Sequence, residues 1–201
     1  MSETWTMAQA AMIIEKPPEV LQKTVERATV KPSLARRAGR QVYVFGMRDL
    51  VFYRALDDLK EGLTIRKVFE VYSILKEMPD GAAIGSVEVG HLKYDFKPYV
   101  RLVKARVEET EKLLKLIDAS GPEPVIRGTG INAYRIAALG DGMSVAEILE
   151  DYPALTERQV QAAKAYAESS PKAGRPYPKS TAKRAMREAR ADADPYLPTR
   201  R

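Results

Sequence analysis

Residues 6–45, TMAQAAMIIEKPPEVLQKTVERATVKPSLARRAGRQVYVF, decide the fold of the first part of the chain. The first nine of these residues favour a helix, because Met7, Ala10 and Ile14 are spaced to share one apolar face. A turn follows. A second helix can open at Pro17 or Pro18, since the first helical position does not need the N–H that proline lacks. With this helix running to about residue 28, the pattern predicts a helix-turn-helix.

A basic stretch follows the second helix. Residues 31–40 contain a proline, a glycine and four basic residues, and residues 41–45 (QVYVF) are rich in β-forming types. We therefore expect a basic loop and a short strand, which together form a wing. The expected DNA contacts are Gln22, Lys23 and Arg27 on the second helix, and Lys31, Arg36, Arg37 and Arg40 in the wing.

The chemistry of these side chains suits DNA. Glutamine can pair with adenine through two hydrogen bonds, arginine and lysine can pair with guanine, and basic side chains in a wing neutralise phosphates. Glu19 and Glu26 also face outward on the second helix and would repel phosphate unless they accept a hydrogen bond from cytosine. A solvated basic loop without a nucleic-acid partner is the alternative interpretation of residues 31–40.

Three further segments are predicted before residue 120. Helices are expected over residues 49–60 and 64–77, and a hairpin or linker over residues 78–96. A long helix follows Pro98, with apolar residues and one threonine at alternating steps of three and four, the spacing of a coiled-coil seam. The seam residues are Val100, Val103, Val107, Thr110, Leu114 and Ile117. This helix either packs on its own domain or pairs with a second copy in a homodimer.

A second helical unit begins after Gly121-Pro122. Ser144 with Glu147, and Thr156 with Gln159, fit the capping-box pattern that marks a helix start. With a helix around residues 132–139, these starts predict a three-helix unit that ends near residue 167. The chain is thus expected to be mainly α, with a winged helix-turn-helix (1–78), a linking and dimerisation helix (79–120), a three-helix unit (121–168) and a basic tail (169–201).

The positive charge is concentrated in the tail. The chain has a net charge of +6, and from Pro171 onward nine basic residues stand against three acidic ones, so the preceding residues are neutral overall. Apart from an alanine-rich stretch over residues 181–191, the tail has almost no apolar residues. We expect it to be disordered or marginally helical alone, and to act as an interaction arm.

Several function classes are disfavoured. The chain has no cysteine and one histidine, His91, so we expect no metal site and no cofactor. The paired acids Asp57-Asp58 and Glu108-Glu109 are adjacent in sequence, where a helix points them apart, so we do not expect an enzyme. No apolar run is long enough for a membrane span and the first ten residues lack an export signal, which leads us to expect a cytoplasmic protein.

Two stretches resemble known families. Thr6 to Ala11 (TMAQAA), Pro18, Leu21, the basic wing and Asp49-Leu50 are similar to the winged helix-turn-helix of MerR-like regulators, over about residues 4–78. PVIRGTGI at residues 124–131, GMS at 142–144, EILEDYP at 147–153, LT at 155–156 and AYA at 165–167 resemble the domain-of-unknown-function 433 family, a module of VapB-like antitoxins.

The second resemblance implies an antitoxin that represses its own operon and neutralises a PIN-like ribonuclease toxin. Such a nuclease holds metal with clustered carboxylates, which arginine can pair with through two hydrogen bonds. The expected toxin contacts in the tail are Arg175, Lys183, Arg184, Arg187, Arg190 and Tyr196. Two alternatives stay open: a tail that only adds non-specific affinity for DNA, and a regulator that responds to a ligand and has no toxin partner.

Overall fold

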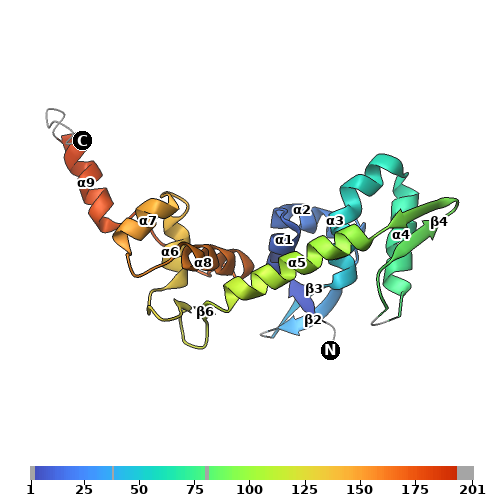
Figure 1. Cartoon of the computed structure of the whole chain (residues 1–201), viewed down its shortest axis with the longest axis horizontal. Coiled ribbons are helices and arrows are strands. Elements are labelled where there is room, and N and C mark those ends of the chain that lie inside the picture. The colour runs from blue at the N-terminus through green and yellow to red at the C-terminus, as the bar shows by residue number, and fades with distance from the viewer. Residues whose placement is uncertain (1–2, 38, 80–81, 194–201) are drawn as a thin grey trace. The chain divides into compact units, whose positions relative to one another are not determined.

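The computed structural model describes residues 3–37, 39–79 and 82–193 and divides the chain into two compact units (Figure 1). The N-terminal unit runs to Lys112 and includes Glu168–Ser170, and the C-terminal unit comprises Leu113–Ala167 and the chain from Pro171. The molecule is mainly helical, as predicted. In the described part of the chain, no helix has both the length and the apolar character needed to cross a membrane.

The N-terminal unit opens with strand β1 (Thr4–Thr6) and helices α1 (Met7–Ile14) and α2 (Pro18–Glu26), close to the predicted bounds. Strands β2 (Ser33–Arg37) and β3 (Arg40–Gly46) follow as an antiparallel hairpin, and β1 pairs with β3, giving the strand order β1-β3-β2. The prediction of a loop over residues 31–40 was therefore wrong for residues 33–37. These residues form an edge strand, where charged side chains are well tolerated.

Both short helices have well-defined ends. Thr6 caps α1 in a capping box with Gln9, whose side chain accepts a hydrogen bond from the Thr6 N–H at 3.0 Å. Each helix ends at a residue in the left-handed conformation, Glu15 (φ 58°) after α1 and Ala28 (φ 53°) after α2. The next N–H in each case bonds back five residues, from Lys16 to Ala11 and from Thr29 to Thr24, both at 3.0 Å. These Schellman-type ends fix where α1 and α2 stop.

Helices α3 (Met47–Gly62) and α4 (Ile65–Glu77) complete the core of the N-terminal unit. Its largest fully buried side chains are Ile13, Ile14, Leu21, Phe45, Leu50, Phe52, Tyr53, Leu75 and Phe96. They come from α1, α2, β3, α3, α4 and the end of the second hairpin. The hydrophobic effect therefore fixes the helices against the sheet that carries the β2–β3 hairpin.

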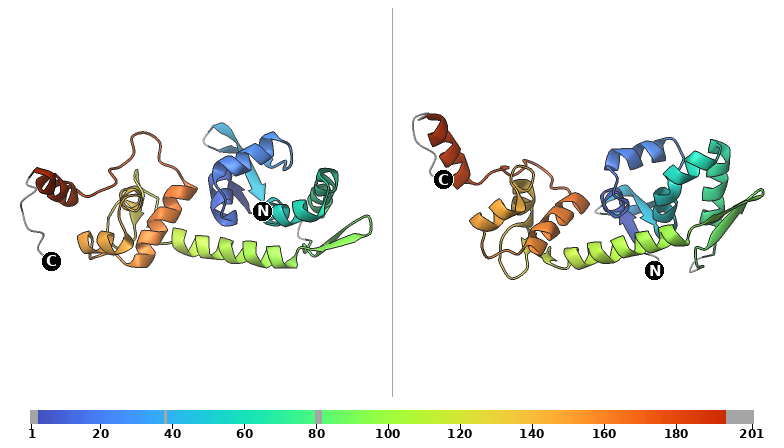
Figure 2. Two further views of the ribbon diagram at one scale, coloured as in Figure 1. Left: turned by 90° about the horizontal axis from the view of Figure 1, so that it is seen from above. Right: turned by 45° about the horizontal axis from the view of Figure 1, so that its top comes forward.

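The predicted hairpin after residue 78 is present as β4 (Ser86–Val89) and β5 (Leu92–Asp95), and it leads into α5 (Lys97–Leu114) (Figure 2). Val103 and Val107 of the predicted seam belong to the core of the N-terminal unit, with exposures of 1% and 6%. This favours packing of the helix on its own domain. Ile117 was wrongly placed in the helix, because it lies in β6 (Ile117–Asp118), which pairs with β7 (Val125–Ile126).

The C-terminal unit contains the predicted three helices, α6 (Ala133–Leu139), α7 (Val145–Asp151) and α8 (Glu157–Ser169). Both predicted capping boxes are confirmed. The N–H groups of Ser144 and Thr156 donate to Glu147 Oε2 at 2.8 Å and to Gln159 Oε1 at 2.9 Å. The buried core includes Ile117, Ile126, Ile136, Leu139, Ile148, Leu155 and Val160. Local sequence signals thus determine where α7 and α8 begin.

The tail contains a further helix, α9 (Ala182–Ala193). Thr181 lies just before it, and its hydroxyl accepts a hydrogen bond from the Arg184 N–H at 3.4 Å. The expectation of a disordered or marginally helical tail considered the tail alone. Contacts with α7, described below, supply the stabilisation that such a short helix lacks in isolation.

Candidate functional site

The β2–β3 hairpin separates its side chains between two faces. The strand register pairs Leu34 with Tyr43 and Arg36 with Gln41, and all four side chains are exposed. Because side chains alternate along a strand, these four share one face. The opposite face carries Val44, which is buried. The hairpin therefore presents an arginine, an amide and a tyrosine to solvent on a single face.

The predicted wing residues whose side chains the structure describes are all exposed. Lys31 is exposed just before β2, Arg36 is exposed in β2, and Arg40 is exposed at the start of β3. Arg37 pairs through its backbone with Arg40, and its side chain lies outside the described part of the structure. The hairpin thus brings Arg36 and Arg40 close to its turn.

The three predicted residues of the second helix are also exposed. Gln22 and Lys23 lie on α2, and Arg27 directly follows it. The Gln22 side-chain amide donates to Glu26 Oε1 at 2.9 Å, so this glutamate has a partner within α2. In the left view of Figure 2, α2 and the β2–β3 hairpin both lie away from α5, whereas Figure 1 shows α2 at the top of the N-terminal unit and the hairpin at its bottom.

Tyr53 of α3 forms a hydrogen bond with the buried side of helix α2. The Tyr53 hydroxyl donates to the Leu21 carbonyl at 2.9 Å, and Leu21 is fully buried. Burial raises the pKa of Tyr53 to about 12, so the phenol keeps its proton at neutral pH and stays a donor. This bond fixes α2 on the core through its buried side and leaves Gln22 and Lys23 free to face outward.

The hairpin is fixed at both ends by one buried carboxylate, Asp49, which is 1% exposed. Asp49 Oδ2 accepts from the Gly46 N–H at 2.8 Å, at the end of β3. Asp49 Oδ1 accepts from the Tyr72 hydroxyl at 2.7 Å and from Lys76 Nζ at 3.1 Å. The Tyr72 oxygen in turn accepts from the Lys31 N–H at 3.0 Å, just before β2. We call these five residues the anchor network.

The electrostatics of the anchor network keep Tyr72 neutral beside Asp49. Burial is the main cause that raises the pKa of Tyr72, and the neighbouring Asp49 charge raises it further. The phenol therefore remains a donor to the carboxylate. Lys76 supplies the opposite charge that a buried carboxylate requires.

Sequence reasoning missed Gln41 and Tyr43 as exposed members of the hairpin surface. Tyr43 is 45% exposed, and a tyrosine hydroxyl can donate to phosphate oxygen. The signal that could have identified them is the period-two alternation of β3, in which residues 41 and 43 lie opposite the buried Val44. It was overlooked because residues 41–45 were interpreted only as β-forming.

The predicted tail contacts are split by the structure. Arg175, Lys183, Arg187 and Arg190 are exposed, whereas Arg184 is only partly exposed and points at α7. Tyr196 lies outside the described residues. Steps of three along a helix rotate by about 300°, so Arg184 can face α7 while the next two arginines turn toward solvent.

Arg184 binds a group of carboxylates on α7. Its guanidinium lies 3.0 Å from Glu147 Oε1, 3.1 Å from Glu150 Oε2 and 3.2 Å from Asp151 Oδ2. The Thr181 hydroxyl donates to the same Asp151 oxygen at 2.8 Å, which is the main reason that the pKa of Asp151 is lowered, with Arg184 adding to it. We call these contacts of Thr181 and Arg184 with α7 the tail latch.

The anchor network makes a prediction about stability. Tyr72→Phe removes the hydroxyl that links Asp49 to the Lys31 N–H, so we expect a loss of about 1–3 kcal/mol in the free energy of unfolding. Urea unfolding followed by the fluorescence of Trp5, the chain's one tryptophan and part of the N-terminal unit, measures it. Tyr43→Phe, on the exposed face of the hairpin, is the matched control and should change stability by less than about 0.5 kcal/mol. Equal losses would contradict the network.

The tail latch makes a second prediction. Arg184→Ala should abolish the slow hydrogen exchange of α9 amides, because an isolated helix of this length is marginal in water. Hydrogen exchange with mass spectrometry checks this, with Arg187→Ala as control on the exposed side of α9. The pKa of Asp151 is lowered from 3.8 in the folded chain. The tail latch therefore contributes its full stability above pH 3.8, and this stability is lost as the pH falls from there through the lowered pKa. Slow exchange unaffected by Arg184→Ala counts against the latch.

The comparison with protein families concerns the C-terminal unit. Residues 118–167, from β6 into α8, match the family described as "Protein of unknown function (DUF433)", which confirms that part of the resemblance found in the sequence. The chain is also 33% identical over 89 residues to the uncharacterized protein y4eO of Sinorhizobium fredii. That alignment covers 42% of this chain and 40% of the relative, so the similarity spans less than half of either protein.

The N-terminal unit has no such support from known structures, since no solved structure is significantly similar to the chain. The MerR-like and VapB-like resemblances therefore stay predictions. The comparisons show that residues 118–167 match the DUF433 family, whose function is unknown.

Proposed function

We propose that the chain is a DNA-binding transcription regulator of the antitoxin type, whose N-terminal unit binds operator DNA as a winged helix-turn-helix. The observation that carries this proposal is the order of elements: α1 and α2 come between β1 and a basic β2–β3 hairpin, and the three strands form one sheet of order β1-β3-β2. Both α2 and the hairpin expose cationic and amide side chains to solvent. The resemblance to MerR-like regulators supports the same function.

In this proposal α2 enters the major groove. Gln22, Lys23 and Arg27 are the side chains that reach base edges or adjacent phosphates. The hairpin lies along the backbone, where Arg36 and Arg40 neutralise phosphates and Tyr43 adds a hydroxyl donor. Residues 1–170 are neutral overall, so the affinity depends on these local patches and not on the charge of the whole unit.

Operators read by a helix-turn-helix commonly contain two half-sites, so we propose that a homodimer binds DNA. Val103 and Val107 of α5 already pack in the chain's own core, which leaves other positions of this helix for contact between copies. Leu102, 49% exposed, is the large apolar side chain that α5 offers to a second copy.

We further propose that the tail neutralises a PIN-like ribonuclease toxin. Support comes from the DUF433 domain in the C-terminal unit and from the arginines of α9. Arg187 and Arg190 are exposed and can pair with a partner that presents clustered carboxylates, and Lys183 is exposed but lies 3.6 Å from Asp151 Oδ1. Arg184 already pairs with the carboxylates of α7, so a toxin would compete with the tail latch for it.

A regulator that senses a ligand and has no toxin partner is the second candidate. It is favoured by a cavity at the foot of the β2–β3 hairpin, described in the next subsection. The two candidates share the DNA-binding unit and differ in what the chain responds to. Binding of the neighbouring gene's product distinguishes them directly.

DNA binding is tested with the DNA upstream of the chain's own gene. Arg36→Ala and Arg40→Ala should weaken binding to all sequences, and each should reduce the slope of log affinity against log salt by about 0.9. Lys23→Ala with Arg27→Ala should instead remove the preference for the operator over unrelated DNA. Lys112→Ala, exposed on α5, is the control and should change neither quantity. If the α2 variant keeps full specificity in fluorescence anisotropy, α2 does not read the DNA.

Toxin binding is tested by copurification with the product of the adjacent gene. Deleting residues 171–201 should abolish binding of a carboxylate-rich nuclease and leave operator binding largely intact. Arg187→Ala with Arg190→Ala is the sharper variant, because both side chains are exposed and the tail latch is kept. It should also lose the toxin. Parallel loss of operator and toxin binding, or an adjacent gene that encodes no nuclease, counts against the antitoxin role.

A further inference from the structure

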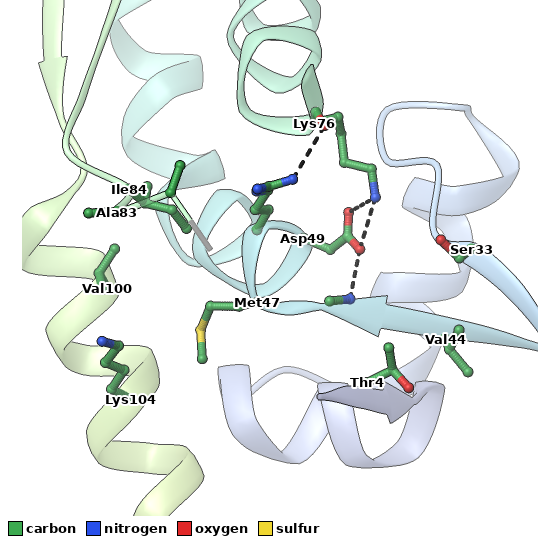
Figure 3. Close-up of a pocket in the computed structure, with 13 residues that line it drawn as sticks. Thr4, Ser33, Val44, Met47, Asp49, Lys76, Ala83, Ile84, Val100 and Lys104 are labelled. Atoms are coloured by element: carbon green, nitrogen blue, oxygen red, sulfur yellow. Dashed lines mark hydrogen bonds and ion pairs between the residues drawn. The ribbon is translucent and has the colours of Figure 1, made fainter. Parts of the chain in front are cut away.

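A cavity of about 520 Å³ opens in the N-terminal unit at the foot of the β2–β3 hairpin (Figure 3). Elements far apart in sequence line it, including β3, the start of α3, the end of α4, the segment before β4, and α5. Its volume is in the range of sites that bind small molecules. None of the contacts proposed for DNA or for a toxin uses this space.

The lining combines apolar side chains with ammonium groups. Val44, Met47, Ile84 and Val100 provide the apolar surface. Lys76, Lys104 and Arg48 provide positive charge, and the Arg48 guanidinium donates to the Lys76 and Pro79 carbonyls. Lys104 is exposed and forms no ion pair within the part of the chain that the structure describes. Lys76 Nζ contacts Asp49 at 3.1 Å, but its side chain is 34% exposed. Since an ammonium group has three donors, Lys76 can serve Asp49 and one further acceptor.

The one carboxylate in the lining does not attract a cation into the cavity. Asp49 is almost completely buried and already accepts from Gly46, Tyr72 and Lys76. The charged groups that can still pair with a ligand are therefore cations, and the lining also includes the neutral hydroxyl side chains of Thr4 and Ser33. A small anion with an apolar body would complement both halves of the lining.

We propose that this cavity binds a small amphipathic carboxylate, with Lys104 and Lys76 at the carboxylate and Val44, Met47, Ile84 and Val100 around its apolar body. A ring suits this surface, because the Met47 sulfur packs favourably against aromatic groups. The site deepens the proposed function, because three members of the anchor network, Gly46, Asp49 and Lys76, line the cavity.

The anchor network gives the cavity a physical connection to the hairpin. Asp49 holds Gly46 at the end of β3 and, through Tyr72, the Lys31 N–H before β2. A ligand carboxylate that also accepts from Lys76 shares the ammonium group with Asp49. In this proposal the sharing weakens the attraction between Lys76 and Asp49, and with it the support of both hairpin ends. Such a ligand changes DNA affinity if it binds more tightly to the chain with a loosened hairpin than to the chain with both hairpin ends fixed. This coupling rests on the proposed DNA-binding function, whereas ligand binding itself does not.

Binding is tested on the full chain with 3-phenylpropanoate as the probe. We expect a Kd of about 1 mM by titration calorimetry, as is typical for a ligand of this size in an open site. Methyl resonances of Val44, Ile84 and Val100 should shift on titration. The neutral amide and the cationic amine of the same skeleton should bind at least about fivefold more weakly, because they lack the charge that pairs with lysine. Equal binding of all three probes, or no binding of the carboxylate, overturns the proposal.

Two variants locate the site. Lys104→Gln should weaken binding of 3-phenylpropanoate by about fivefold, and Arg101→Gln, exposed on the same helix but outside the cavity lining, should not. Equal effects of the two variants would place the probe elsewhere. Operator affinity is then measured with saturating carboxylate and with the amide as control. If the chain binds the probe but no DNA, the proposed DNA-binding function is refuted and the ligand site is supported. If the chain binds DNA but not the probe, the ligand site is refuted and the proposed function is unaffected.

Discussion

The N-terminal unit depends on a buried carboxylate that has no water to stabilise its charge. An uncompensated charge in the interior would cost several kcal/mol, so Asp49 must be matched by donors and an opposite charge. The backbone of Gly46, the phenol of Tyr72 and the ammonium of Lys76 supply them. Since these groups come from the end of β3 and from α4, satisfying one carboxylate fixes how the hairpin, α3 and α4 meet. The same requirement places the hairpin ends next to a cavity with cationic walls.

Local signals explain why much of the fold could be predicted from the sequence. A capping box involves residues three apart, so Ser144 with Glu147 and Thr156 with Gln159 fix two helix starts without reference to the rest of the chain. The anchor network is of the opposite kind. Tyr72 lies 23 residues from Asp49 and 41 from Lys31, and no local pattern connects them. The strand β2 was missed because proline, glycine and arginines suggest a loop, while pairing with β3 decides its structure.

The helix α5 shows the limit of periodicity as a guide to partners. A three-four spacing of apolar residues says that one face is buried, but it does not say against what. Val103 and Val107 are buried by the core of their own unit, so a seam that fits a coiled coil is already used within the chain. At Ile117 the spacing continues although the helix has ended, because a β-branched residue also suits the short strand that pairs with β7. For the proposed DNA-binding surface, the sequence likewise predicted the basic residues but not which residues of β3 face solvent, and the exposed Tyr43 was therefore missed.

The tail illustrates how charge counted along a sequence differs from charge offered to a partner. Arg184 contributes to the basic tail, yet it neutralises three carboxylates of α7, and two of them, Glu150 and Asp151, lie in the last turn, where the helix dipole disfavours negative charge. A partner that takes Arg184 must therefore replace three carboxylate contacts, and it leaves Asp151 with only Lys183 and Thr181 as partners from the tail. Arg187 and Arg190 carry no such cost. Under the proposed function, these two would make the first contact with a toxin, and only a partner with equally close carboxylates could also bind Arg184. The tail latch thereby discriminates against weakly acidic surfaces and favours a site built from clustered carboxylates.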